Sequence, residues 1–175
     1  MIKLSRLSLS ELEVVIPCFE NDALRDVVGG GATGSYAISG GNIVNYEFDG
    51  EKYCVFYGDN GDSFVFRGVN VGSGSMGGGV AYQLNGTIHL GDSYSSFDVD
   101  DMLHEYGHYM QQILGSFGSY VGVAANSLWA TIRQKLSGNY DYYSNSSEQK
   151  ASLLGQIYMD YYYPGSGHTA TGYQP

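Results

Sequence analysis

The chain has 175 residues, of which 43% are hydrophobic and 14% aromatic. This composition suits one folded domain, with or without an additional arm, and argues against disorder along the whole length. A formal net charge of −10 argues against a nucleic-acid partner, because binding to phosphates requires a basic surface. Every apolar run is shorter than the roughly 18 residues of a membrane-spanning helix, so no membrane span is predicted.

Residues 1–34 are predicted to form an N-terminal arm and linker, followed by a single domain over 35–175. The glycine-rich stretch 29–34 is typical of a flexible joint. The N-terminus lacks the long apolar stretch of a signal peptide, so an export signal is either absent or already removed. Cys18 and Cys54 allow at most one intrachain disulfide. The many tyrosines and glycines, with few basic residues, favour a secreted or cell-surface protein.

Between residues 41 and 90 the pattern predicts strands and turns. The predicted strands are 43–48, 53–57, 64–66, 80–84 and 87–90. Asp49-Gly50, Asn60-Gly61 and Asn85-Gly86 are typical turn dipeptides between them. The glycine-rich stretch 72–79 lacks the Gly-Lys-Ser/Thr ending of a phosphate-binding loop.

After Gly91 the pattern becomes helical, with helices predicted over 98–117, 119–136 and from 145–148 to about Pro164. The first has a capping residue at Ser95 or Ser96 and acidic residues in its first turn. Its core face is predicted to consist of Met102, Leu103, Tyr106, Met110, Ile113, Leu114 and Phe117. Strands first and helices after indicate an α+β fold.

The first predicted helix carries an H-E-x-x-H pattern, His104-Glu105-Tyr106-Gly107-His108. Two histidines four residues apart lie one turn above each other, so both imidazoles can reach one metal ion. Glu105 is then placed to take a proton from a metal-activated water. The alternative is a pair of histidines satisfied by hydrogen bonds, which this spacing with a glutamate between them disfavours. Gly107 is small enough for a strand or loop to pass close to the helix.

The third metal ligand has to come from elsewhere in the chain. The metzincin pattern H-E-x-x-H-x-x-G-x-x-H is absent, because position 111 is Gln and position 114 is Leu. Glu148, which opens the third predicted helix, is the candidate; the alternative is that it only stabilises the helix N-terminus. His168 is another possible third ligand or transition-state donor, although a histidine in a flexible tail is the simpler interpretation.

The stretch 104–112, His-Glu-Tyr-Gly-His-Tyr-Met-Gln-Gln, resembles the H-E-Y-G-H-x-x-Q helix of small gluzincin-type metallopeptidase domains found in bacterial exported and toxin-associated proteins. In such domains the later glutamate occurs in an E-x-x-A-[Asp/Asn] setting. Residues 148–152, Glu-Gln-Lys-Ala-Ser, match except at Ser152, a departure expected to weaken the support of a zinc-binding histidine. The resemblance covers roughly residues 80–163.

This resemblance implies a zincin-like fold, with a small antiparallel or mixed sheet followed by an active-site helix and two further helices. It also implies that an edge strand lies beside that helix and pairs with an extended peptide substrate. The strand at 87–91 is the candidate, with Ile88 and His89 as substrate-binding residues, although a solvent-facing role is the simpler interpretation of His89.

These observations predict a zinc metalloendopeptidase in which His104, His108 and Glu148 bind Zn²⁺ and Glu105 is the general base. The expected partner is a peptide or protein substrate, and the expected setting is an exported effector or the C-terminal piece of a larger secreted polypeptide. The alternative is a catalytically inactive zinc-containing binding or structural module, or a latent precursor whose N-terminal arm fills the cleft. The presence of Glu105 favours the enzyme, because a purely structural zinc site has no need of that carboxylate.

Tyrosines just before Glu148 are candidates for polarising the substrate carbonyl or stabilising the oxyanion. Tyr142 and Tyr143 are the two catalytic candidates among them, beside Tyr140. Aromatic packing in a loop is an equally good interpretation of each.

Overall fold

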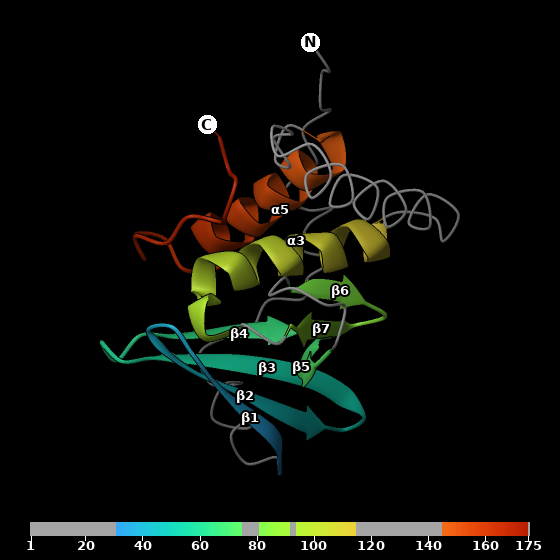
Figure 1. Ribbon diagram of the computed structural model, residues 1–175, viewed down its shortest axis with the longest axis vertical. Coiled ribbons are helices and arrows are strands. Elements are labelled where there is room, and N and C mark those ends of the chain that lie inside the picture. The colour runs from blue at the N-terminus through green and yellow to red at the C-terminus, as the bar shows by residue number, and fades with distance from the viewer. Residues whose placement is uncertain (1–30, 75–80, 92–93, 115–144, 175) are drawn as a thin grey trace.

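The computed structural model describes residues 31–74, 81–91, 94–114 and 145–174. Within these ranges the elements are β1 (Ala32–Ile38), β2 (Gly41–Phe48), β3 (Glu51–Gly58), β4 (Ser63–Arg67), β5 (Asn70–Ser73), β6 (Tyr82–Leu84), β7 (Thr87–Leu90), the 3-10 turn η1 (Tyr94–Ser96), α3 (Val99–Leu114) and α5 (Ser146–Tyr162). Two sheets precede the two helices, as the α+β prediction required (Figure 1).

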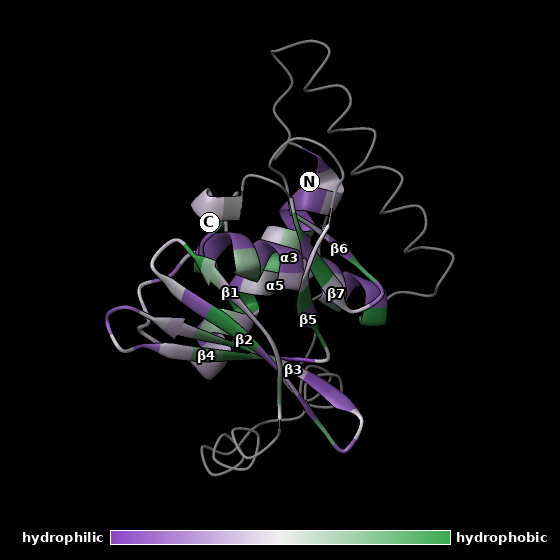
Figure 2. Ribbon diagram, turned by 60° about the horizontal axis from the view of Figure 1, so that its bottom comes forward, coloured by the Kyte–Doolittle hydropathy of each residue, from purple (hydrophilic) through white to green (hydrophobic). Residues whose placement is uncertain are grey.

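The first sheet is antiparallel, in the order β1-β2-β3-β4, and confirms the three strands predicted between residues 43 and 66. Asp49 and Gly50 both adopt positive φ at the β2–β3 turn, which is why this dipeptide predicted a hairpin. The additional strand β1 was not predicted. It begins at Ala32, inside the segment interpreted as a flexible joint, and its register shifts between Ala32 and Gly34. Hydrophilic hairpin ends and hydrophobic strand centres alternate along this sheet (Figure 2).

The second sheet is mixed, in the order β5-β7-β6, with β5 parallel and β6 antiparallel to β7. The prediction that the strand at 87–91 is an edge strand is therefore wrong, because β7 is paired along both sides. Within the described part of this sheet, β6 is the outer strand on the side of α3. Gln83 of β6 donates a 3.0 Å hydrogen bond from Nε2 to Oε1 of Gln112 on α3.

Asn45 of β2 joins the two sheets through its buried side chain. Its Oδ1 accepts the Val71 N–H at 2.8 Å, and its Nδ2 donates to the Val71 carbonyl at 2.7 Å. The amide thus pairs with β5 as another strand would. The main core lies between these sheets and α3, α5 packs against α3, and Tyr158 and Met159 of α5 also belong to this core (Figure 1).

Helix α3 begins after Asp98, whose Oδ1 accepts the N–H groups of Asp100 and Asp101, so Asp98 and not Ser95 or Ser96 is its cap. Of the predicted core face, Met102, Leu103, Tyr106 and Met110 are buried. Ile113 is 41% exposed, which corrects its assignment to the core. Leu114 is half-buried, and Phe117 lies outside the described residues. The predicted helix at 119–136 lies outside them as well.

Helix α5 confirms the third predicted helix. Asn145 is its N-cap, with a side chain that accepts the Ser147 N–H, and the helix ends at Tyr162, before Pro164. At its C-terminal end two tyrosines bond to one residue of the edge strand β4: the Val65 N–H donates to Tyr163 Oη at 2.8 Å, and Tyr158 donates to the Val65 carbonyl.

No helix in the described ranges has the length and apolarity to cross a membrane.

Helices α3 and α5 run antiparallel with their backbones in direct contact. One glycine on each helix permits this close approach. A Cβ on Gly107 would lie 1.9 Å from the Ala151 carbonyl oxygen, and one on Gly155 would lie 2.2 Å from that of Leu103. The element that passes Gly107 is therefore a helix, where a strand or loop was expected. This contact brings the first turn of α5 over the middle of α3.

Candidate metal centre

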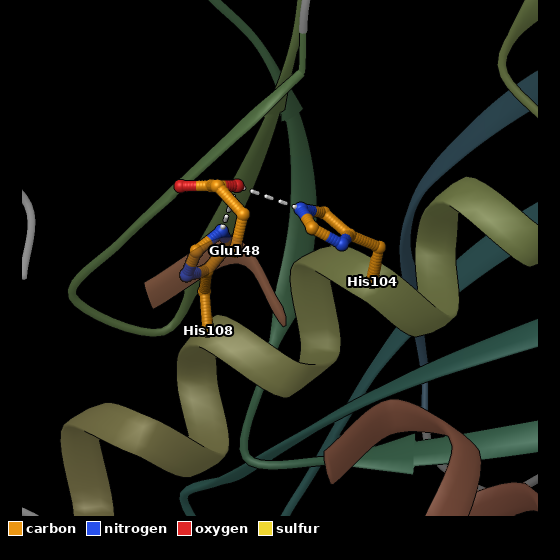
Figure 3. Close-up of side chains that lie close together, drawn as sticks. All are labelled: His104, His108 and Glu148. Atoms are coloured by element: carbon orange, nitrogen blue, oxygen red, sulfur yellow. Dashed lines mark hydrogen bonds and ion pairs between the residues drawn. The ribbon is translucent and has the colours of Figure 1, made fainter. Parts of the chain in front are cut away.

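Three buried side chains converge where α5 crosses α3. Glu148 Oε2 lies 3.1 Å from His104 Nε2 and 3.2 Å from His108 Nε2, so one carboxylate oxygen faces both imidazoles (Figure 3). Among the described residues, these three side chains form the group that could hold a metal ion. Their ligand atoms all lie within 4.8 Å of one another. In a tetrahedral zinc site with bonds of about 2.0–2.1 Å, ligand atoms lie roughly 3.3 Å apart. The two distances from the Glu148 oxygen are close to that value.

A hydroxyl group fixes the tautomer of His104. Ser152 Oγ lies 2.9 Å from His104 Nδ1, and it also lies 2.7 Å from the Thr171 carbonyl and 3.0 Å from the Glu148 carbonyl. Carbonyl oxygens only accept, so the single hydroxyl proton goes to one of them. Ser152 Oγ therefore accepts the hydrogen on His104 Nδ1. The Nε2 lone pair of His104 is then directed at Glu148.

An amide fixes the tautomer of His108 in the same way. Gln111 Nε2 donates to the Ser147 carbonyl at 2.7 Å, which turns Gln111 Oε1 toward His108 Nδ1 at 3.0 Å. Oε1 is an acceptor, so Nδ1 carries the hydrogen. His108 Nε2 then presents its lone pair to Glu148 as well.

Two lone pairs and a carboxylate oxygen cannot face one another stably unless a positive charge lies between them. That charge is either a bound cation or a proton. Burial alone would lower the pKa of His108, but its hydrogen bond with Glu148 and the charges of Glu105 and Glu148 raise that pKa to about 8. A proton can thus occupy the position at neutral pH, and a metal ion has to displace it.

Glu105 lies beside this cluster with an unsatisfied oxygen. Its carboxyl group is buried, and Oε2 has no hydrogen-bond partner among the described residues. Burial raises the pKa of Glu105; the charges of His108 and His104 oppose this, and the charge of Glu148 adds to it. A buried carboxyl oxygen without a partner requires one, and a water or substrate group at a metal ion would supply it.

His168 is not part of the cluster. Its Nδ1 lies 3.0 Å from Asp100 Oδ1 in the first turn of α3, and its ring packs against Phe64. It is therefore a partner of the helix N-terminus, which leaves Glu148 as the third member of the group, as predicted.

Ile88 and His89 were predicted to bind substrate because their strand was expected at the edge of a sheet, and β7 lies in the middle of its sheet. Ile88 is fully buried, and the His89 ring stacks on Tyr82 with centroids 4.7 Å apart. Neither belongs to an edge strand. Tyr142 and Tyr143 lie outside the described residues, as does Tyr140, so their proposed roles stay predictions.

Ser152 contacts the site through a hydrogen bond that the sequence did not predict. Its hydroxyl lies within hydrogen-bonding distance of His104, and the expectation that serine supports a ligand histidine more weakly than an acid or amide stays a prediction. The available signal was its position, one helical turn after Glu148.

Comparisons of the chain with protein-family models, with curated proteins and with solved structures found no match.

Proposed function

We propose that this protein is a zinc-dependent metalloendopeptidase of the gluzincin type, acting as an exported or cell-surface effector. The observation that carries the proposal is the buried cluster of His104, His108 and Glu148, with the partnerless carboxyl oxygen of Glu105 beside it. The resemblance of residues 104–112 to the active-site helix of such enzymes supports the same conclusion.

The donor set favours zinc over other common divalent cations. Two imidazole nitrogens and one carboxylate oxygen form a usual ligand set of catalytic zinc, whereas Mg²⁺ and Ca²⁺ prefer oxygen ligands. The described residues supply three protein ligands, which is also the number in catalytic sites, where one position serves water or substrate.

When bound, zinc would polarise the scissile carbonyl and lower the pKa of a water molecule. Glu105 takes the proton from the attacking water and passes it to the leaving amine. Its burial, which raises its pKa, makes the carboxylate a better proton acceptor than an exposed glutamate. Tyr142 and Tyr143 remain candidates for stabilising the oxyanion. The substrate backbone would pair with β6, the outer strand beside α3, in place of β7.

The second candidate is a zinc-containing module without turnover, or a latent precursor. The observation in its favour is the low exposure of the cluster: His104, Glu105 and His108 are 5%, 8% and 9% exposed, and Glu148 is fully buried. A substrate would need more access than these values provide.

Glu105→Gln separates the two candidates. The amide cannot accept the water proton, so we expect zinc content and fold to be retained and peptide cleavage to fall by roughly 10²–10⁴-fold. The measurements are elemental analysis and digestion of an unbiased peptide library, with Glu47→Gln on the exposed end of β2 as the matched control. Equal cleavage by Glu105→Gln and the parent would refute the general-base role. Absence of cleavage by the zinc-loaded parent would favour the module.

A further inference from the structure

We propose that Ser152 is a positioning residue for the metal ligand His104 and that the C-terminal segment 168–171 holds Ser152 in that role. The inference rests on the proposed zinc site and extends it to a segment that the metal-binding motif does not include. It follows from a continuous line of contacts that starts at His104 and ends in the tail.

The first contacts run from the imidazole to the tail backbone. His104 Nδ1 lies 2.9 Å from Ser152 Oγ, which lies 2.7 Å from the Thr171 carbonyl. The other acceptor of the hydroxyl, the Glu148 carbonyl, is farther away at 3.0 Å. With its proton directed at Thr171, Ser152 offers a lone pair to His104 and keeps Nε2 available for a metal ion.

The tail is fastened to both helices of the metal site. The Thr171 N–H donates to the Asp100 carbonyl at 3.0 Å, and Thr171 Oγ1 donates to Asp101 Oδ1 at 2.7 Å, both in the first turn of α3. The Ala170 N–H donates to Gln156 Oε1 on α5 at 2.9 Å. Ala170 is 1% exposed and Ser152 beside it is fully buried, so water has no access to the Ser152 hydroxyl while this segment is in place.

Water at this position would compete for the hydrogen on His104 Nδ1 and free the ring to change tautomer. The tail and the metal should therefore stabilise each other. Because coupling between two binding events is reciprocal, a docked tail raises zinc affinity, and bound zinc tightens the docking of the tail.

The first arm of the test is zinc affinity, measured by chelator competition on the full chain. Ser152→Ala should lower the affinity about 10–100-fold, the usual range for the loss of a hydrogen bond to a ligand histidine. Ser152→Thr, which keeps the hydroxyl, should restore most of it. Ser35→Ala is the control for the loss of one serine hydroxyl, since Ser35 is exposed on β1 and its Oγ bonds to the Asn42 side chain. Unchanged affinity in Ser152→Ala overturns the proposal.

The second arm uses metal-free protein and does not depend on zinc binding. Nitrogen chemical shifts of the His104 ring, at neutral pH where a proton can occupy the position facing Glu148, should show hydrogen on Nδ1 in the parent and a shift toward the Nε2 tautomer in Ser152→Ala. A purely structural role for Ser152 would leave the tautomer unchanged and would overturn the inference. If the parent binds no zinc, the proposed function fails, and this arm still decides the role of Ser152.

The third arm tests the tail. In the full chain, added zinc should slow hydrogen exchange at the amides of Ala170 and Thr171, and a chain ending at residue 167 should bind zinc more weakly. Exchange in the full chain gives an answer even where the shortened chain does not fold. Exchange rates that zinc leaves unchanged at both amides would overturn the role assigned to the tail.

Discussion

Gly107→Ala tests whether the helix crossing sets the geometry of the metal site. The new Cβ would lie 1.9 Å from the Ala151 carbonyl oxygen, whereas real Cβ contacts below 3.0 Å are essentially never seen. The two backbones therefore have to separate by about 1.1 Å along this line. Ala151 lies one turn after Glu148, so the carboxylate moves with it.

Two opposing effects determine the stability of this variant. Alanine is favoured over glycine in a helix by about 1 kcal/mol, and overpacking of a close contact costs about 1–3 kcal/mol. Because the new Cβ meets backbone atoms and not the end of a flexible side chain, the upper part of the overpacking range applies, and the expected net loss in the free energy of unfolding is about 2 kcal/mol. The effect on the site is larger, because a shift of about 1.1 Å is more than half of a zinc–ligand bond of about 2.0 Å. Zinc affinity should fall at least about tenfold.

The assay is a zinc titration by chelator competition, with thermal unfolding of the metal-free protein measured in parallel. Gly31→Ala is the control, because a Cβ at Gly31 meets nothing within 4 Å. Gly155→Ala, whose Cβ would lie 2.2 Å from the Leu103 carbonyl oxygen, should resemble Gly107→Ala. A Gly107→Ala protein that binds zinc as tightly as the parent would refute the reasoning.

Two further predictions concern the ligands. Glu148→Ala should lower zinc affinity at least about tenfold through the loss of one ligand. His168→Ala should lower it far less, because His168 contacts Asp100 and can affect the site only through the C-terminal segment. Zinc titration of both variants decides, and the opposite pattern would contradict the ligand assignment. Zinc affinity should also fall as the pH decreases through about 8, since the raised pKa of His108 means that a proton competes with the metal below that value. Titrations on either side of pH 8 measure this, and an affinity independent of pH would show that His108 is not a ligand.

Local pattern was sufficient for most of the elements. Positive φ at Asp49-Gly50 and Asn85-Gly86 is the physical reason that these dipeptides marked two hairpins correctly. The sequence pattern did not predict β5, and without β5 it could not show that β7 is the central strand of its sheet. Asn70–Ser73 is short, contains a glycine and pairs with a strand 17 residues away, so nothing in its own sequence indicates a strand. The order of strands in that sheet could not be inferred without it.

Within the site, residue spacing identified His104 and His108, because four residues on a helix fix their relative positions. The direction of Glu148 was undetermined, since a first-turn carboxylate suits either a cap or a ligand. Packing decides it: the contact at Gly107 turns this face of α5 toward α3. The contribution of Ser152 depends on the same closeness, because its short side chain reaches His104 only where two backbones touch.

The tyrosine pair at the end of α5 has a consequence for association. β4 is an edge of the four-stranded sheet, and an unpaired edge offers N–H and carbonyl groups to any other extended chain. At Val65 both groups are already bonded to the side chains of Tyr163 and Tyr158. A strand arriving from another molecule would have to displace two phenol groups, of which Tyr158 belongs to the core and Tyr163 packs against it. This side of the sheet is therefore protected against strand addition, and the helix that carries Glu148 provides the protection.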